Sequence, residues 1–326
     1  MSTTHLPKPF FVGLDIGGTK IEALLVDQEM NVCAQARRPT DISHPDNLAA
    51  SAAAAIDEVL HQAGAERAQL GGIGIGIPGQ VDPASGAVAL AANLNLKAYP
   101  LGTVMSSKMD APTFVENDVR IAAMGVYRWL QAQEPVTNIA YLSVGTGVAA
   151  GVVLNGRLHR GSHGMAGEIG HITLDLHGPK CNCGAHGCLE TYVAGPAIVR
   201  QALGKVTFGV PDNEVHAGHV YQAAQNGSLA AQAIVQKASQ HLSRAIQLLI
   251  MLYDVDKVVL GGGVAQSGSA FLAPIQAELA LLRAEAPLFE TLISADKITL
   301  LPAGYNAGTW GAVYLAQEMK EQKTKD

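Results

Sequence analysis

Three of the four cysteines in this sequence lie within eight residues of one another, at Cys181, Cys183 and Cys188. Three clustered thiols cannot all pair with each other, and Cys33 is far upstream. Gly184 and Gly187 lie between the cysteines and allow the backbone to fold tightly enough for all three sulfurs to face one point. Because zinc prefers thiolate and imidazole ligands, this spacing predicts a metal site.

A tetrahedral site needs a fourth ligand, and a histidine would complete the Cys3His set that is common for zinc. We favour His171, with His177 and His186 as rivals. Four protein ligands leave no open position, so the zinc is expected to be structural and not catalytic. Glu168 and Glu190 flank the site, and a bound metal would hold the loops of both carboxylates in register.

Two glycine-rich turns have the same local design. One joins apolar runs at 11–16 and 21–26, and the other joins runs at 139–144 and 148–154. Each reads as strand, turn, strand, whereas a Rossmann or Walker A loop would lead from a strand into a helix. Backbone N–H groups in such turns can bind phosphate, and the recurrence indicates an internal duplication. With the strand and three glycines at 255–268, these turns predict a three-point nucleotide cradle.

A further candidate group, Asp118, follows a short strand. Either Asn117 or Asp118 can cap the helix that begins there. Ligands of open α/β sheets bind at the carboxyl ends of the strands, so Asp118 is also a candidate acid–base residue. Upstream, Asp46 is expected to cap an alanine-rich helix that stops near Gly64.

The composition describes the protein that must position these groups. A chain of 326 residues with 48% hydrophobic and 15% charged residues is long and apolar enough for two folded domains. The net charge of −6 argues against nucleic acid or an anionic membrane as the main partner. The N-terminal stretch is unlike a signal peptide, and no apolar run could span a bilayer. We therefore expect a cytoplasmic protein with reduced thiols.

Seven motifs, taken in order, resemble the ROK family of sugar kinases and sugar-responsive repressors. They are DIGGTK (15–20), GIGIPGQVD (74–82), END (116–118), GTGVAAG (145–151), AGEIGH (166–171), CNCGAHGCLE (181–190) and GGGV (261–264). The resemblance implies an α/β, two-lobed fold of the actin, hexokinase and Hsp70 group, with a duplicated ribonuclease H-like core and a central cleft between the lobes. The smaller lobe would comprise 1–115 plus 307–326, and the larger lobe, with the zinc motif, 116–306.

The resemblance also implies roles for individual residues. Asp118 would be the general base on the sugar hydroxyl. The sugar would be bound by Pro78, Gly79, Asn93, Asn117, Asp118, Glu168, His171 and Glu190. The nucleotide would be bound by Asp15, Gly17, Gly18, Thr19, Lys20, Gly145, Thr146, Gly147, Gly261, Gly262 and Gly263. His171 would bind zinc through one ring nitrogen and the sugar through the other.

The implied reaction is transfer of phosphate from ATP, with Mg2+, to the 6-hydroxyl of glucose, in a protein that also holds structural Zn2+. N-acetylglucosamine kinase and fructokinase are the alternatives within the family. A regulator lacking a DNA-binding domain is the alternative from another class. Only ten residues precede Phe11, so we expect no helix-turn-helix. The expected partners are a hexose, ATP and further copies of the chain, as a homodimer or homotetramer.

The sequence departs from the family pattern in three places. Ala149 and Ala150 stand where glycines are frequent, and Val119–Arg120 follows Asp118 where small residues are usual. Leu96 stands where tryptophan is common, and the smaller side chain is expected to leave room for an acetamido group near the sugar. This expectation makes N-acetylglucosamine the main rival to glucose.

Overall fold

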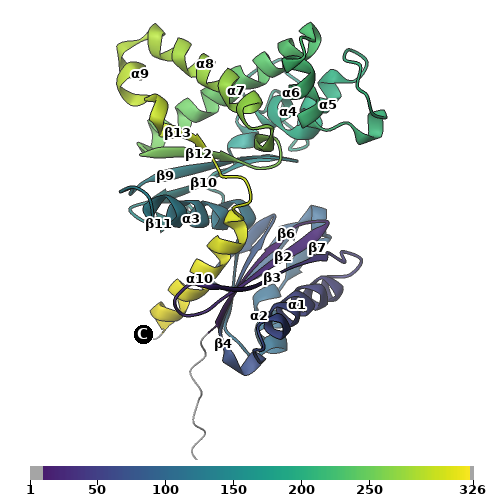
Figure 1. The fold of residues 1–326 in the computed structure, drawn as a ribbon, viewed down its shortest axis with the longest axis vertical. Coiled ribbons are helices and arrows are strands. Elements are labelled where there is room, and N and C mark those ends of the chain that lie inside the picture. Colours follow the sequence, from purple (N-terminus) through teal and green to yellow (C-terminus); the bar gives the residue numbers. More distant parts are fainter. Residues whose placement is uncertain (1–9, 324–326) are drawn as a thin grey trace, which may run out of the picture. The chain divides into compact units, whose positions relative to one another are not determined.

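The computed structural model describes residues 10–323, which form two compact units (Figure 1). The first unit comprises the described residues up to Gln133, Arg160–Met165 and the chain from Asn306 onward. The second comprises Glu134–His159 and Ala166–Tyr305. The first unit therefore extends past residue 115, where the smaller lobe was predicted to end. Residues 1–9 and 324–326 of that predicted lobe lie outside the described residues.

The first unit is built on a mixed sheet with the strand order β3-β2-β1-β4-β8. Its strands are β1 (Phe10–Ile16), β2 (Lys20–Val26), β3 (Val32–Pro39), β4 (Leu70–Ile77) and β8 (Thr113–Asn117). The first three pair antiparallel, while β1, β4 and β8 run parallel. The predicted strand, turn, strand at the N-terminus is confirmed, because β1 and β2 pair directly on either side of the first glycine turn.

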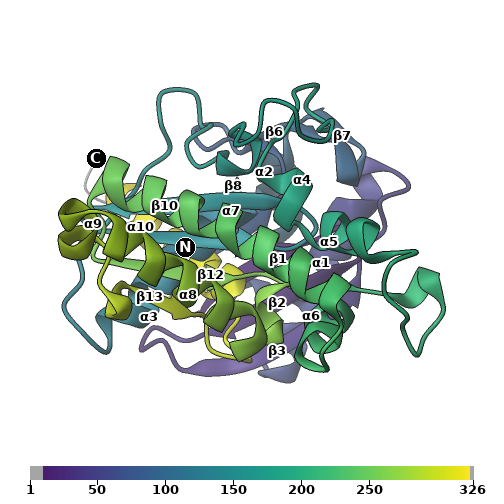
Figure 2. The same ribbon diagram turned by 90° about the horizontal axis from the view of Figure 1, so that it is seen from above.

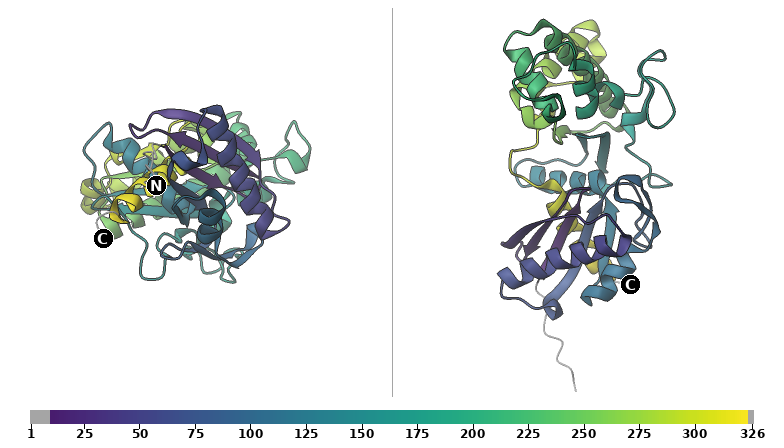
Figure 3. Two further views of the ribbon diagram at one scale, coloured as in Figure 1. Left: turned by 90° about the horizontal axis from the view of Figure 1, so that it is seen from below. Right: turned by 90° about the vertical axis from the view of Figure 1, so that its right-hand side faces the viewer.

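Helices cover both faces of this sheet (Figure 3, right). They are α1 (Pro45–Gln62) and α2 (Leu101–Met109) on one face, and α3 (Asp118–Gln131) and α10 (Ala307–Lys323) on the other. Glycines let α10 approach the sheet closely: a Cβ on Gly74 would lie 1.8 Å from the Ala312 carbonyl oxygen. The C-terminal helix can therefore pack on strands formed by the start of the chain.

The start of α1 differs from the prediction. The cap is His44, whose Nδ1 accepts a hydrogen bond from the Asp46 N–H at 3.2 Å. Pro45 occupies the first helical position, which makes the residue before it the cap. The predicted Asp46 cap is therefore wrong. The remaining elements of this unit are a small antiparallel sheet of β5 (Gln80–Asp82), β6 (Ala87–Ala91) and β7 (Leu96–Tyr99), with η1 (Arg67–Gln69) and η2 (Ala92–Leu94).

The second unit repeats the same sheet. Its strand order is β11-β10-β9-β12-β13, again with three antiparallel strands followed by parallel ones. The strands are β9 (Ile139–Val144), β10 (Val148–Leu154), β11 (Arg157–Leu158), β12 (Lys257–Gly261) and β13 (Ile298–Leu300). The duplication predicted from the two glycine turns is confirmed in strand order and direction.

One group of helices shares the large apolar core of this second sheet, with the long α7 running beside α8 (Figure 2). Ser228 caps α7 by accepting from the Ala231 N–H. The helices of this unit are α4 (Glu190–Val193), α5 (Gly195–Ala202), α6 (Ala217–Gln225), α7 (Leu229–Tyr253), α8 (Ser269–Glu285), α9 (Pro287–Leu292), η3 (Ile169–His171), η4 (Asp212–Glu214), η5 (Ala265–Ser267) and η6 (Ala295–Lys297), of which η4 and η6 lie outside the core. Within residues 10–323, no helix is both long and apolar enough to cross a bilayer.

Candidate active site and metal centre

The first glycine turn joins β1 to β2 and is fixed by backbone and hydroxyl hydrogen bonds. The Gly17 N–H donates to the Lys20 carbonyl at 2.8 Å. Thr40, just past β3, donates from its hydroxyl to the Gly17 carbonyl at 2.7 Å and from its N–H to the Thr19 carbonyl at 3.1 Å. The sequence motif did not indicate Thr40, because this residue reaches the turn only through strand pairing.

Asp15 lies near the end of β1, just before this turn. Its pKa is raised to about 7, mainly by burial and also by the charges of Asp118 and Glu22, against the opposing effect of Lys20. Asp15 and Asp118 are therefore close enough to interact, although Asp15 lies in β1 and Asp118 begins α3, far along the sequence. The sheet thus gathers two candidate carboxylates at the carboxyl ends of its parallel strands, where such sheets bind ligands.

Asn117 and Asp118 lie at the junction of β8 and α3. Asn117 is the cap: its Oδ1 accepts from the N–H groups of Val119 and Arg120, both at 3.1 Å. Its amide nitrogen donates to the Gly79 carbonyl at 3.1 Å, which attaches the predicted Pro78–Gly79 sugar loop to the start of the helix. Of the two capping candidates, the structure selects Asn117.

Asn93 is exposed in η2, beside the first glycine turn: a Cβ on Gly18 would lie 3.7 Å from the Asn93 carbonyl oxygen. Leu96 behaves differently. Its side chain is 1% exposed and packs in the core of the first unit, so it does not border open space. The expectation that Leu96 leaves room for an acetamido group is therefore wrong.

A buried ion network behind Asp118 was not predicted. Glu116 is fully buried and accepts from Arg120 Nε at 2.9 Å and from Arg160 Nε at 2.6 Å. Arg120, which is 3% exposed, also donates to the Gly164 carbonyl. These bonds join Arg160 and Gly164 to β8 and α3, and residues 160–165 belong to the first unit. The signal in the sequence was Arg120 itself, a large charged residue where the family usually has a small one.

The second glycine turn, Gly145–Thr146–Gly147, belongs to the second unit and joins β9 to β10. The Gly145 N–H donates to the Gly147 carbonyl at 2.9 Å, and the Gly145 carbonyl accepts from the Gly195 N–H at 2.8 Å. The Val148 N–H donates to Glu190 Oε2 at 3.0 Å. A predicted sugar ligand therefore contacts the end of a predicted phosphate turn.

The three glycines after β12 lie next to the second turn. Gly262 has a φ of +86°, and a Cβ there would lie 2.5 Å from the Val144 carbonyl oxygen. A Cβ on Gly145 would lie 3.7 Å from the Gly263 nitrogen. Two of the three predicted parts of the nucleotide cradle are thus neighbours within the second unit, and the third, at Gly17–Lys20, belongs to the first.

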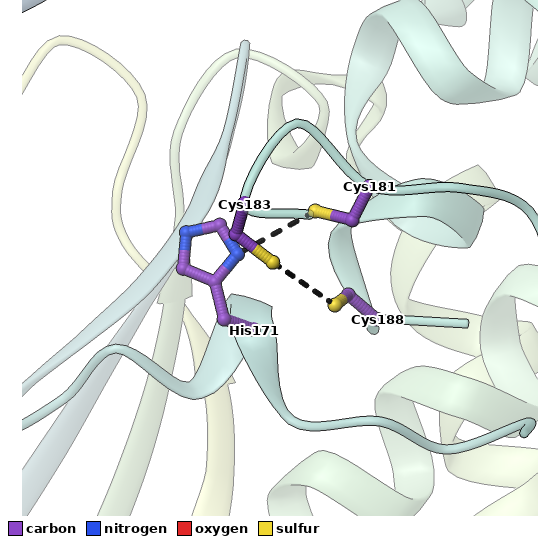
Figure 4. A group of neighbouring side chains, drawn as sticks. All are labelled: His171, Cys181, Cys183 and Cys188. Atoms are coloured by element: carbon purple, nitrogen blue, oxygen red, sulfur yellow. Dashed lines mark hydrogen bonds between the residues drawn. The ribbon is translucent and has the colours of Figure 1, made fainter. Parts of the chain in front are cut away.

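The four predicted zinc ligands converge on one point (Figure 4). The ligating atoms of His171, Cys181, Cys183 and Cys188 lie within 4.8 Å of one another. His171 Nδ1 is 3.6 Å from Cys181 Sγ, and the sulfurs of Cys183 and Cys188 are also 3.6 Å apart.

The two distances of 3.6 Å fit a tetrahedral zinc ion. Zn–S bonds of about 2.3 Å and a Zn–N bond of about 2.0 Å place neighbouring ligand atoms about 3.5–3.8 Å apart. His177 and His186 are not in the cluster, and His186 Nδ1 instead lies 3.3 Å from the Gly178 carbonyl oxygen. Nδ1 of His171 faces the sulfurs, which leaves Nε2 for another partner.

Tight turns shape the loop around this cluster. Gly184 and Gly187 have φ values of +96° and +64°, and a Cβ on Gly187 would lie 1.6 Å from the Asp175 carbonyl oxygen. Asp175 also accepts a hydrogen bond from the Tyr192 hydroxyl at 2.7 Å. Glu168 directly precedes η3, and its carbonyl accepts from the His171 N–H at 3.1 Å. The same fold therefore positions both Glu168 and the metal cluster.

The ROK family profile matches residues 11–319. This chain belongs to the ROK family. A glucokinase of Halalkalibacterium halodurans is 31% identical over 97% of both chains. An N-acetylmannosamine kinase of Escherichia coli is 32% identical over 95% of this chain and 99% of its own length. A xylose repressor of Caldicellulosiruptor bescii is 30% identical over 63% of this chain and 53% of its own length.

The fold is also that of a solved ROK enzyme. A ROK glucokinase of Streptomyces griseus, in complex with glucose and AMPPNP, is 28% identical and superposes with a TM-score of 0.76 over 95% of this chain and 99% of its own. The two-lobed α/β fold predicted for this ROK chain is confirmed.

Proposed function

We propose that this protein transfers the γ-phosphoryl group of ATP to the 6-hydroxyl of glucose. This reaction is one case of the broader activity of the chain, that of an ATP-dependent sugar kinase of the ROK family. Glucose is supported by the name of the H. halodurans relative and by the ligand in the S. griseus structure. The observation that carries the proposal is the grouping of Asp118, Asp15 and Asn117 at the carboxyl ends of parallel strands.

Asp118 is the proposed general base. Asn117 is the N-cap of α3, and Asp118 Oδ1 also accepts from the Val119 N–H at 2.9 Å, so the first turn of the helix fixes the position of this carboxylate. The rigid start of the helix holds this carboxylate so that it can accept the proton of the attacking hydroxyl as the new O–P bond forms. Phosphoryl transfer otherwise depends on positioning and charge neutralisation, and Mg2+ bound with ATP would neutralise charge on the phosphates.

The proposed sugar ligands are divided between the units. The first unit supplies the Pro78–Gly79 loop, Asn93 and Asn117, and the second supplies Glu168, His171 and Glu190. Such groups form hydrogen bonds to several ring hydroxyls, and a site of this kind rejects an analogue that lacks one of them. In the second unit, zinc held by the Cys3His cluster would supply structural rigidity to the loops of Glu168 and Glu190.

The three glycine segments are the proposed nucleotide ligands, through backbone N–H groups other than those of Gly17 and Gly145, which already donate to carbonyls of their own turns. They are Gly17–Lys20 in the first unit, with Gly145–Gly147 and Gly261–Gly263 in the second. Their hydrogen bonds within the structure preform each turn, so little backbone ordering is needed when phosphate binds. Asp15, two residues before Gly17, is proposed to bind the nucleotide together with the first of these segments.

The test is an ADP-release assay over glucose, mannose, fructose, N-acetylglucosamine and N-acetylmannosamine. We expect glucose to have the highest kcat/KM. A kcat/KM for another sugar that is about tenfold higher would overturn the glucose assignment and leave the kinase intact. Sugar binding without turnover of any hexose would instead favour a regulator or a binding module.

A variant tests the base separately. Asp118→Asn keeps the shape of the side chain but removes its basicity, so kcat should fall by about two to four orders of magnitude. Calorimetric titration should show that the variant still binds the sugar. Loss of sugar binding with unchanged residual turnover would make Asp118 a binding residue.

N-acetylmannosamine kinase is the second candidate function, because a relative of that name matches nearly the whole chain. The burial of Leu96 removes the structural reason for expecting an acetamido pocket at that residue. The sugar panel therefore decides between the two, with glucose as our expectation.

A further inference from the structure

The short segment from Cys188 to Gly195 contacts three parts of the second unit at once. Cys188 belongs to the metal cluster, Glu190 hydrogen-bonds the Val148 N–H, and the Gly195 N–H donates to the Gly145 carbonyl. We propose that Glu190 is a positioning residue that couples sugar binding to the conformation of the second phosphate turn. This proposal rests on the sugar-kinase function given above.

The carboxylate of Glu190 has two oxygens for two tasks. Oε2 accepts from the Val148 N–H at 3.0 Å, directly after the turn, which leaves Oε1 for a sugar hydroxyl. A hydrogen bond to a carboxylate is about twice as strong as a neutral one. Any shift of the carboxylate toward a sugar hydroxyl therefore changes the bond that holds the first residue of β10.

Gly147 provides a second contact between Glu190 and the turn. A Cβ on Gly147 would lie 2.8 Å from Glu190 Oε2. The φ of Gly147 is not in the positive range, so alanine can adopt the backbone there. The glycine therefore leaves room for the carboxylate of Glu190, which an added Cβ would displace.

The backbone that carries Glu190 is fixed. Cys188 and Leu189 are fully buried, and the Leu189 N–H donates to the Ile172 carbonyl at 3.0 Å. The Thr191 hydroxyl donates to the Cys188 carbonyl at 2.7 Å. Because this backbone is held on both sides of Glu190, a sugar can move the side chain but not the segment. The displacement is then passed to the turn.

Coupling between two ligands must be reciprocal. A change in the phosphate turn should alter sugar affinity, and a change in Glu190 should alter nucleotide affinity even when no sugar is present. If Glu190 only bound sugar, a change in Glu190 would weaken sugar binding but would leave nucleotide affinity unaltered when no sugar is present.

The first experiment is Gly147→Ala, with glucose titrated calorimetrically in the absence of nucleotide. We expect the Kd for glucose to rise by about fivefold or more, within the usual range for coupled sites. The fold should survive, because the clash is with the mobile end of a side chain. The matched control is Gly209→Ala, an exposed glycine of the second unit outside the proposed site, with no positive φ and nothing within 4 Å of an added Cβ. Its glucose Kd should not change.

The second experiment is Glu190→Gln, with AMPPNP titrated in the absence and presence of glucose. We expect weaker AMPPNP binding without sugar. The ratio of the AMPPNP Kd measured without glucose to that measured with glucose should move toward one. Asn93→Ala is the control, since Asn93 is a proposed sugar ligand in the first unit. It should weaken glucose binding but keep that ratio at saturating glucose.

Amide hydrogen exchange separates this proposal from the proposed function. Measured with no ligand, exchange of the Val148 amide should be faster in both Gly147→Ala and Glu190→Gln than in the wild type. Unchanged exchange in both variants, or equal glucose Kd values for Gly147→Ala and Gly209→Ala, would overturn the coupling. A wild-type protein that binds no hexose would overturn the sugar-kinase function, and the exchange result would still decide whether Glu190 holds the turn.

Discussion

The two sheets have the same strand order, but their glycine turns are held by different groups. In the first unit, the hydroxyl and N–H of Thr40 bind the carbonyls of the turn. In the second, the carboxylate of Glu190 and the N–H of Gly195 hold the corresponding turn. Thr40 is a neutral structural partner, whereas Glu190 is also a candidate sugar ligand. Duplication thus preserved the backbone cradle while the side chains that hold it diverged.

The units also stabilise their polar loops differently. The first buries a carboxylate between two arginines, and the second gathers four metal-binding side chains. The residue two positions before the turn is Asp15 in the first unit and Ser143 in the second. The aspartate before the first turn therefore corresponds to a serine before the second. The polar loops are held by a buried ion network in the first unit and by a metal cluster in the second. Each prediction below tests one side of this contrast.

The largest effect is expected from Arg120→Met in the ion network of the first unit. Removing one partner of a buried ion pair typically costs about 3–5 kcal/mol, because the remaining charge is left uncompensated. Here that charge is on Glu116, and Arg160 remains to offset part of the loss. Urea unfolding should measure the change. Arg160→Met is the control, and it should cost less because Arg160 is about one-third exposed. Equal losses would show that burial does not set the strength of the network.

The next effect is a dependence of stability on pH that comes from Asp15. Its folded pKa of about 7 exceeds the unfolded value of 3.8, so the folded state holds a proton that the unfolded state loses between these values. Stability should therefore fall as the pH rises from about 4 to about 7, by an amount on the order of a few kcal/mol. Unfolding of the ligand-free protein across this range measures it.

Asp15→Asn should flatten that profile, because the amide does not titrate. Ser143→Ala, at the matching position of the second unit, should leave the slope unchanged. A slope that persists in Asp15→Asn would assign the titration to another group.

Cys183→Ala tests the metal cluster of the second unit. Loss of one thiolate should release zinc and loosen the loops of Glu168 and Glu190, which lowers sugar kcat/KM by about 10–100-fold. Elemental analysis should find one zinc per chain in the wild type and less in the variant. Cys33→Ala, an exposed cysteine in the first unit, should keep both zinc and activity. A wild-type protein purified without chelator and lacking zinc would contradict the prediction.

The smallest effect is expected from Thr40→Val, which removes the hydroxyl bond to the first turn but keeps the N–H bond. The loss of one neutral hydrogen bond is worth about 1 kcal/mol, so the KM for ATP should rise by several-fold. Glucose affinity should not change, in contrast to Gly147→Ala in the second turn. A change in glucose affinity would mean that both turns are coupled to the sugar.

Features with short sequence separation could be predicted with good accuracy. The strand, turn, strand units at 10–26 and 139–154 follow from apolar runs interrupted by glycines, and both are present. The spacing of Cys181, Cys183 and Cys188 indicated a metal cluster because the intervening glycines permit a tight loop. The predicted Asp46 cap was wrong although it depends only on neighbouring residues, because Pro45 takes the first helical position and makes His44 the cap.

Among the alternatives that the sequence left open, tertiary packing made the choice. The sequence did not distinguish Asn117 from Asp118 as the cap. In the structure, the Asn117 amide donates to the Gly79 carbonyl while its Oδ1 accepts from the Val119 N–H. His171 was one of three candidate ligands until the loop folded it toward the sulfurs. Leu96 looked like part of a sugar loop, but the small sheet buries it in the core.

The sequence by itself determined the family, the repeated glycine turns and the cysteine cluster, because these depend on residue types at short spacing. Only the tertiary structure brought Glu116 to Arg160, and Glu190 to the Val148 N–H, across separations of 44 and 42 residues. Such pairs depend on which strands and helices pack together, and many distant partners satisfy the same local pattern. A buried charge or amide must find a hydrogen-bond partner in the fold, and the packing of the core decides which partner is near enough.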